Sequence, residues 1–209
     1  MHIPDGYLDL HIAITFIALS IAILWYVLTR TKIEIDGRKI PLIGIVAGGI
    51  FVAQMLNWPI PGGTSAHLVG GAIAAILLGP YMGCIAMASV LIVQCLLFGD
   101  GGITALGANI WNMAIVNVFV AYFVYKFIRQ KLNGGINISS FAAGWAGITL
   151  AAIFAGVEIG ISSAFKYSIY VTVPVMGIWH GLLGIIEGII TAGVVFYVYK
   201  NRPDLLYLR

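Results

Sequence analysis

Seven long runs of apolar residues dominate the sequence and leave little room for anything except membrane-spanning helices. The runs cover residues 10–29, 41–57, 66–78, 81–97, 103–125, 139–157 and 177–199. A helix needs roughly 20 apolar residues to cross a bilayer, so these runs use most of the chain. Their apolar residues are continuous, without the alternation that marks a transmembrane barrel. We therefore predict an all-α polytopic bundle of about seven transmembrane helices in a single domain, residues 1–209.

The scarcity of charge supports this prediction and excludes other classes. Only 9% of the residues are charged, whereas a soluble domain carries about a quarter. The net charge of +3 comes from basic residues in short loops, so no basic stripe indicates a nucleic-acid partner. The two cysteines, Cys84 and Cys95, lie within apolar runs and indicate neither a disulfide framework nor a zinc site. The lipid bilayer is the environment that this composition requires.

The positions of the basic residues predict an orientation. If seven runs span the membrane, ten of the eleven basic residues lie on one face and only Lys166 lies on the other. By the positive-inside rule, the basic face is cytoplasmic. We expect the N-terminus outside and the C-terminus inside, with Met1 retained because no basic segment of a signal peptide precedes the first run. The ten residues are Arg30, Lys32, Arg38, Lys39, Lys126, Arg129, Lys131, Lys200, Arg202 and Arg209.

Two features leave the span count open. The run at 66–78 has 13 residues, which is short for a full span, and only Gly79 and Pro80 separate it from the next run. Six full spans with one partial helix therefore remain an alternative.

With this orientation, most polar residues of the apolar chain fall at or near the outer face. Polar groups in a span are costly and usually serve function. The set that converges there is Met1, His2, Asp5, His11, Asn57, His67, Asp100, Asn109, Asn112, Glu158 and His180.

The first two residues offer a specific metal chelate. The amine of Met1, the backbone nitrogen of His2 and the His2 imidazole can surround one ion in two fused rings. The amide must lose its proton, and Ni(II) and Cu(II), which favour square-planar nitrogen donors, promote that loss. Three nitrogens leave a fourth corner. His67, which follows the polar loop 61–66, and His180, near the outer end of its helix, are both candidates for it.

Several segments resemble the CbiM/NikM family, the substrate-specific membrane components of energy-coupling-factor cobalt and nickel importers in bacterial and archaeal cell membranes. The resemblance covers essentially the whole chain. It rests on Met1-His2-Ile3-Pro4-Asp5-Gly6-Tyr7-Leu8, Ser65-Ala66-His67-Leu68-Val69-Gly70-Gly71, Leu78-Gly79-Pro80, Leu97-Phe98-Gly99-Asp100-Gly101-Gly102, Gly107-Ala108-Asn109, Asn112-Met113, Trp179-His180-Gly181-Leu182-Leu183-Gly184 and Glu187-Gly188.

The resemblance implies a function and a ligand set. It implies capture of a divalent transition metal, with Ni²⁺ favoured and Co²⁺ as the alternative, by Met1, His2 and His67. It also implies an N-terminal segment, residues 1–9, that plugs into the bundle. The chain lacks the phosphate-binding loop of ATPases, so it cannot hydrolyse ATP by that route. We interpret it as a transporter subunit and not as an enzyme. The resemblance implies a separate ATPase, a transmembrane coupling subunit and a small accessory membrane protein.

Ligands on a free chain end need restraint from neighbouring groups. We predict that Asp5, His11, Asn109 and Asn112 supply it without touching the metal, and we place His180 with them if His67 is the fourth donor. Glu187, about ten residues into the last run, is interpreted either as an intramembrane relay or as the partner of a neighbouring Asn or Ser.

Two other functional classes remain as alternatives. The first is an ion-coupled secondary metal carrier, in which Glu187 would relay protons, although no clear inverted repeat is detected. The second is an intramembrane metalloenzyme, with Glu158 or Asp100 as its base. No His-Glu-x-x-His motif supports the enzyme.

Overall fold

The computed structural model is an elongated bundle of helices, and it describes residues 1–34 and 40–207. The basic residues Arg38 and Lys39 of the first loop lie outside this described part. The elements in chain order are α1 (Leu10–Glu34), α2 (Ile40–Gln54), β1 (Trp58–Pro59), β2 (Ser65–Ala66), α3 (Gly71–Val93), the π-helix η1 (Gln94–Phe98), α4 (Leu106–Ile110), the π-helix η2 (Trp111–Val116), α5 (Asn117–Lys131), α6 (Ile136–Ile161), α7 (Ile169–Asn201) and the 3₁₀ turn η3 (Pro203–Leu205).

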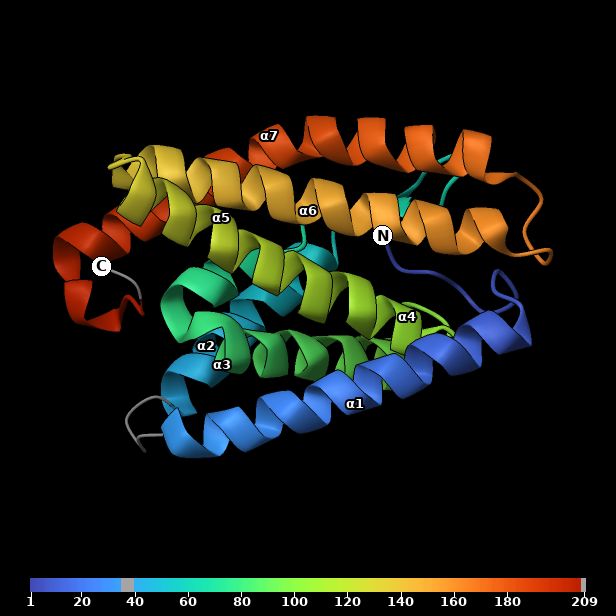
Figure 1. Ribbon diagram of the computed structural model, residues 1–209, viewed down its shortest axis with the longest axis horizontal. Coiled ribbons are helices and arrows are strands. Elements are labelled where there is room, and N and C mark those ends of the chain that lie inside the picture. The colour runs from blue at the N-terminus through green and yellow to red at the C-terminus, as the bar shows by residue number, and fades with distance from the viewer. Residues whose placement is uncertain (35–39, 208–209) are drawn as a thin grey trace.

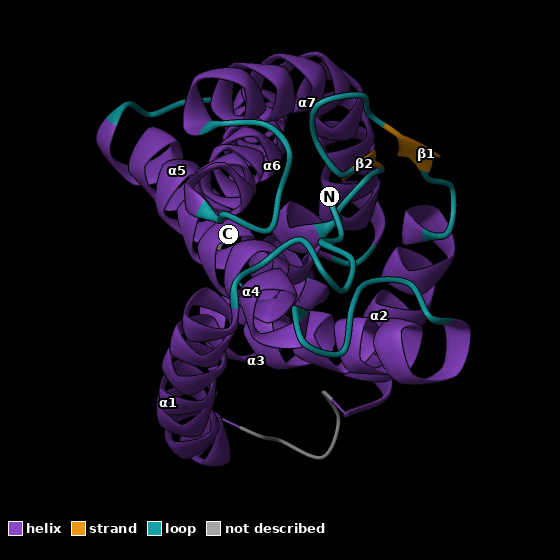
Figure 2. Cartoon of the chain, turned by 90° about the vertical axis from the view of Figure 1, so that its right-hand side faces the viewer, coloured by secondary structure: helices purple, strands orange, loops and turns teal. Residues whose placement is uncertain are grey.

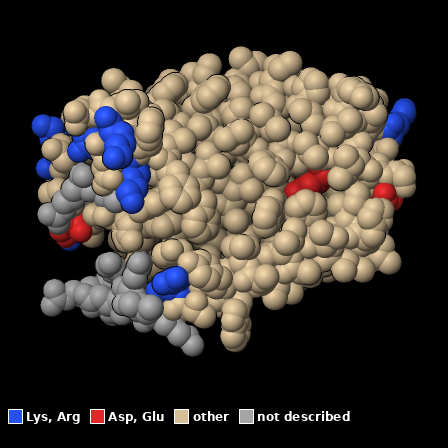
Figure 3. Space-filling model, in the orientation of Figure 1, with Lys and Arg blue, Asp and Glu red and all other residues tan. Residues whose placement is uncertain are grey.

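The bundle is that of a multi-pass membrane protein. Among the described residues, five helical segments are long and apolar enough to cross a membrane, and α2 is a shorter apolar helix. The five segments are Leu10–Thr31, Gly71–Phe98, Leu106–Lys131, Ile136–Ile161 and Ile169–Asn201. The helices lie side by side along the long axis, with α1 on one side and α6 and α7 on the other (Figure 1). The visible face between the two ends carries very few charged side chains (Figure 3).

The third and fourth apolar runs are joined in α3, and the chain turns sharply between them. Gly79 interrupts the helix with φ 83° and ψ 171°, a conformation that L side chains rarely adopt. A Cβ on Gly83 would lie 3.0 Å from the backbone carbonyl carbon of Ala74. In a straight helix, nine residues span about 13 Å, so α3 folds back on itself at Gly79-Pro80. The C-terminal tail packs into this turn, where the Tyr207 amide donates to the Ile76 carbonyl at 3.0 Å.

The run predicted at 66–78 becomes helical only at Gly71. Before that residue the chain is not helical: Ser65 and Ala66 pair antiparallel with Pro59 and Trp58, and Gly70 has the left-handed conformation, with φ 80° and ψ 1°. The backbone N–H groups of Val69 and Gly70 then bond to a side chain of α7. Tertiary contacts therefore replace the first helical turn that the apolar pattern suggested.

The helices α6 and α7 approach each other closely at glycine residues. A Cβ on Gly144 of α6 would lie 3.0 Å from the Cα of Gly188 on α7. Small residues at such positions let helix backbones approach within a membrane. The helix α7 begins at Ile169, eight residues before the predicted run, and it includes Pro174 near its start. Together α6 and α7 form a layer that holds His180 and Glu187 toward the bundle interior, where both are buried.

Candidate metal centre

The chain begins inside the protein, not on its surface. Met1 and Ile3 have 0% exposed surface and His2 has 4%. The N-terminus lies among the loops beside β2 (Figure 2). The first three residues contact the loops at Ser65 and Gly102. The predicted segment 1–9 precedes α1, which begins at Leu10. Its first three residues are thus enclosed by the bundle.

The side chain of Asn109 forms hydrogen bonds with both backbone groups of Ile3 in the terminal segment. The Ile3 amide donates to Asn109 Oδ1 at 2.8 Å, and Asn109 Nδ2 donates to the Ile3 carbonyl at 3.1 Å. The Gly102 amide donates to the same carbonyl at 2.9 Å. Both backbone groups of Ile3 are therefore satisfied inside the protein, as buried backbone groups require.

Asp5 fastens the segment where it leaves the interior. Its carboxylate accepts hydrogen bonds from the Ile103 amide at 3.2 Å, the Thr104 amide at 2.8 Å and the Thr104 hydroxyl at 2.5 Å. The Thr104 hydroxyl bond is the main reason that the pKa of Asp5 falls below its ordinary value. Asp5 and Asn109 thus both tie the terminal segment to the rest of the protein, and their support of a bound metal stays a prediction.

His2 and His67 meet face to face. Their ring centroids are 4.7 Å apart and the ring planes are inclined by 24°. His67 is fully buried, and its Nδ1 lies 2.8 Å from the Leu68 carbonyl. Because a carbonyl oxygen only accepts, Nδ1 carries the hydrogen and Nε2 keeps a lone pair. The Nε2 atom of His67 is buried without a hydrogen-bond partner, as a ligating nitrogen would be before it binds an ion.

The amine of Met1 lies against the loop that carries His67. It donates to the Ser65 carbonyl and, at 2.8 Å, to the Ser65 hydroxyl. The amine and the two imidazoles therefore approach one another from the chain end and from residue 67. These three groups are among the donors that the sequence suggested, and their binding of a metal stays a prediction. Ser65, which accepts hydrogen bonds from the amine, was not named as a site residue.

Burial keeps these nitrogens neutral. Desolvation, followed by the nearby terminal amine, lowers the pKa of His2 to about 3. Desolvation also lowers the pKa of the Met1 amine well below its usual range, and it does the same for His67. Metal ions bind neutral amine and imidazole nitrogens, so the donors stand in their binding form at neutral pH.

Asp100 lies beside His2, and it was not among the supporting residues predicted from the sequence. Its Oδ2 lies 3.6 Å from His2 Nε2 and accepts a hydrogen bond from Asn57 Nδ2 at 3.2 Å. Burial raises the pKa of Asp100, while the terminal amine opposes that rise. The distance of 3.6 Å between Asp100 Oδ2 and His2 Nε2 is longer than a hydrogen bond, and His2 Nε2 is buried without a hydrogen-bond partner.

His180 lies in the second layer around His67. It is fully buried, its Nδ1 is 2.9 Å from the Met176 carbonyl, and its Nε2 has no partner. It is near enough to His67 for the two rings to interact electrostatically. His67 itself stacks directly on His2, so His67 is the better placed of the two candidate donors.

Other predicted residues are not brought to the chelate. His11 is exposed in the first turn of α1, and none of its described contacts reaches residues 1–3 or His67. Asn112 donates to Glu158 Oε2 at 2.7 Å, inside the bundle, instead of contacting the terminal segment. Glu187 accepts from backbone amides, which corrects the expected pairing with an Asn or Ser side chain.

Within the described part of the chain, His, Cys, Asp and Glu side chains do not by themselves form a metal site. Among the described residues, no group of three or more His, Cys, Asp and Glu side chains could hold an ion. A metal centre at His2 and His67 would need further donors, and the Met1 amine lies beside the loop that carries His67. Amine, amide and imidazole nitrogens suit ions that favour nitrogen donors in a plane.

Comparison with known proteins identifies the family. Residues 2–205 match the family model CbiM, described as the cobalt uptake substrate-specific transmembrane region. The chain is 65% identical over 207 residues to the "Putative fused nickel transport protein NikMN" of Archaeoglobus fulgidus, covering 99% of this chain and 68% of that protein. It is 31% identical over 215 residues to the cobalt transport protein CbiM of Geobacter sulfurreducens, covering 99% of this chain and 61% of that protein.

A solved structure gives the same fold. The crystal structure of a truncated transition metal transporter superimposes with a TM-score of 0.92 at 35% identity, covering 96% of this chain and 99% of that one. With the family model matched over almost the whole length, the chain belongs to the CbiM family of nickel and cobalt transport proteins.

Proposed function

We propose that this chain captures Ni²⁺ at the outer membrane face and passes it inward as the substrate-specificity subunit of an ATP-driven importer. The Met1 amine, the His2 amide and imidazole, and His67 Nε2 would hold the ion. The single observation that carries the proposal is the convergence of a buried chain terminus with two stacked histidines, of which His67 keeps an unpartnered nitrogen.

Nickel is preferred over cobalt for two reasons. Four nitrogen donors in a plane favour Ni(II), which forms square-planar complexes readily. The similarity also runs higher toward the protein named for nickel, at 65% identity, than toward the one named for cobalt, at 31%. Co²⁺ is the second candidate, because the matching family model is described by cobalt uptake.

The proposed orientation places the metal centre outside the cell. Lys and Arg side chains gather at one end of the molecule (Figure 3). This end holds the C-terminal ends of α5 and α7 and the N-terminal end of α6 (Figure 1). Lys166, in the loop between α6 and α7, lies at the other end. If both arms of the folded α3 are counted, seven helical passes lead from an outer N-terminus to a cytoplasmic C-terminus.

Energy would come from partner chains. The sequence has no phosphate-binding loop, so the proposal assigns ATP hydrolysis to a separate ATPase and its coupling to a transmembrane partner. A small accessory membrane protein completes the proposed complex. An ion-coupled carrier is less supported, because Glu187 is engaged by two backbone donors and does not extend to the chelate.

A titration with Ni²⁺ tests the proposal. Purified protein in detergent should bind one Ni²⁺ and develop a visible band typical of square-planar nitrogen coordination. His67→Ala should weaken binding strongly and shift the band, because water replaces the fourth nitrogen. His11→Ala is the matched control, since His11 is exposed and its described contacts do not reach the chelate. This substitution should change neither the Ni²⁺ affinity nor the visible band. Equal nickel binding by wild type and His67→Ala would refute the proposed ligand set.

A further inference from the structure

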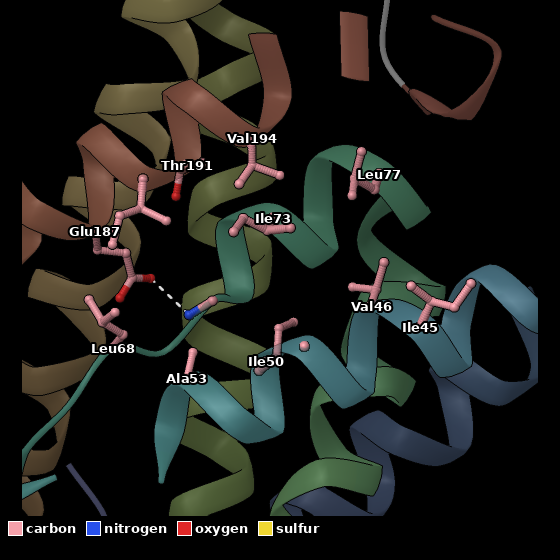
Figure 4. A pocket seen from close by; sticks show the side chains of 13 residues that line it. Ile45, Val46, Ile50, Ala53, Leu68, Ile73, Leu77, Glu187, Thr191 and Val194 are labelled. Carbon is pink, nitrogen blue, oxygen red and sulfur yellow. Dashed lines mark hydrogen bonds between the residues drawn. The ribbon is translucent and has the colours of Figure 1, made fainter. Parts of the chain in front are cut away.

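The segment that carries His67 is held at its far end by one carboxylate of α7. Glu187, with 3% of its surface exposed, accepts the Val69 amide on Oε2 at 2.7 Å and the Gly70 amide on Oε1 at 3.0 Å. Figure 4 shows this carboxylate pointing at the backbone of the segment. Each carboxylate oxygen thus binds one of two successive amides.

The same segment, residues 65–70, is here named the His67 strap. Its near end is fixed by the pairing of β2 with β1 and by the Met1 amine on Ser65. On the side of α2, Gln54 Nε2 donates to the Val69 carbonyl at 2.7 Å. Both backbone groups of Val69 are therefore bonded to buried side chains, and the metal-facing His67 lies two residues before it.

Packing supplies little restraint on one side of the strap. A cavity of about 360 Å³ lies between α2, the first arm of α3 and α7, and Leu68 and Gly70 form part of its wall (Figure 4). Its other lining side chains are apolar except for Glu187 and Thr191. A wall next to a cavity lacks the contacts that fix side chains in a filled core. At Gly70 the strap packs closely against α2, where an added Cβ would lie 2.8 Å from Ile50 Cγ1. On the cavity side, the position of the strap depends on its hydrogen bonds.

We propose that Glu187 is a positioning residue for metal capture, because its carboxylate sets the place of His67 through the amides of Val69 and Gly70. This inference rests on the proposed function and deepens it. Hydrogen bonds to an ionised acceptor are stronger than neutral ones. Breaking these bonds would leave the buried amides of Val69 and Gly70 without partners, at a cost in free energy. We expect the strap to move so that these amides find other acceptors. Movement into the adjacent cavity would draw His67 away from the chelate.

The experiment replaces one carboxylate oxygen by an NH₂ group that cannot accept. Glu187→Gln should lower Ni²⁺ affinity by about ten- to a hundredfold, the usual effect of losing a group that orients a ligand. Its visible spectrum should gain the band seen in His67→Ala. Glu158→Gln is the matched control, since it also changes a buried glutamate with a side-chain partner, Asn112, outside the strap. The control should leave affinity and spectrum unchanged.

A double-mutant cycle separates positioning from a general structural role. If Glu187 acts through His67, adding Glu187→Gln to His67→Ala should cause no further loss of Ni²⁺ affinity. An equal additional loss in that background would overturn the inference while leaving the His67 ligand, and hence the proposed function, intact. Equal affinities of wild type and His67→Ala would instead overturn both.

A readout without metal completes the test. Hydrogen exchange of the apo protein, followed by mass spectrometry, should show faster exchange in peptides covering 67–70 in Glu187→Gln than in wild type. Peptides from α6 should exchange equally in the two proteins, which shows that the fold is retained. Unchanged exchange across 67–70 would mean that Glu187 does not hold the strap.

Discussion

At the scale of single residues, the chemistry depends on an amine that is part of the backbone. Met1 is completely buried, and its amine is hydrogen-bonded to Ser65. A chelate that includes this nitrogen has one feature that no side-chain site shares: it can be abolished without changing any side chain.

Extending the chain before Met1 should therefore abolish high-affinity Ni²⁺ capture. A single added residue converts the amine into a peptide nitrogen and must enter a space that is already filled around Met1. The comparison is with the same tag placed at the C-terminus, and the measurement is Ni²⁺ content after gel filtration. Retention of tight binding by the N-terminally extended protein would exclude the terminal chelate.

The lowered pKa values predict how many protons leave when Ni²⁺ binds. Basic groups are neutral above their pKa, so His2, with a pKa lowered to about 3 by desolvation, loses no proton at pH 6.5. Desolvation also lowers the pKa of the buried Met1 amine well below its ordinary value of 8.0, so this amine should release fewer protons than an exposed one. The deprotonated His2 amide then accounts for the release of about one proton.

A short peptide with the same first residues gives the control. Its amine and imidazole keep ordinary values of 8.0 and 6.5, so at pH 6.5 it should release about two to three protons. Calorimetric titrations in buffers of different ionisation enthalpy count these protons. If the protein releases as many protons as the peptide, its donors are not held neutral by burial.

At the scale of elements, two other parts of the chain hold the terminal segment by hydrogen bonds. Asn109 bonds both backbone groups of Ile3 from the short helix α4, and Asp5 caps the loop that follows η1 through Ile103 and Thr104. The π-helix η2 begins directly after α4, at Trp111. Asn112 thus shares a chain segment with Asn109 but has a different partner.

Asn109→Ala should lower Ni²⁺ affinity by about ten- to a hundredfold and leave the visible band in place. The segment would lose two hydrogen bonds, while the metal would keep its donors. Asn112→Ala serves as the neighbouring control, because its partner is Glu158, and it should leave the titration midpoint unchanged. A shifted band in Asn109→Ala would place Asn109 among the direct ligands.

At the scale of the whole molecule, the arrangement of charge makes a prediction about the membrane. The α6–α7 loop and the α5–α6 loop lie at opposite ends of the bundle (Figure 1). Lys166 and Lys131 are exposed, one in or beside each loop. The native cysteines, Cys84 and Cys95, are buried, so introduced thiols can be labelled selectively.

In intact cells, a membrane-impermeant maleimide should label Lys166→Cys and should reach Lys131→Cys only after the membrane is opened. The reason is the positive-inside rule, which places the basic end in the cytoplasm. Labelling is read by a mass shift on a gel. The reverse pattern would place the chelate on the cytoplasmic side and end the proposal of capture from outside.

The sequence predicted the all-helical membrane fold and the family because hydropathy and local motifs are properties of neighbouring residues. It also predicted that Met1, His2 and His67 would matter. It could not predict that 66–70 is not helical, since the apolar pattern there is overridden by distant contacts, among them the two amides bonded to Glu187. His11 and Asn112 were assigned to the metal centre from their place along the chain, but their contacts lie elsewhere.

What the sequence determined by itself is therefore a membrane bundle of this family, and it predicted nitrogen donors at the start of the chain, because each of those features is local. Only the tertiary structure decided which distant groups serve those donors. Asp100 lies beside His2, Ser65 holds the Met1 amine, and Glu187 fixes the strap from α7. Such pairings join residues up to 118 positions apart, and they arise from helix packing and backbone turns that no short stretch of sequence encodes.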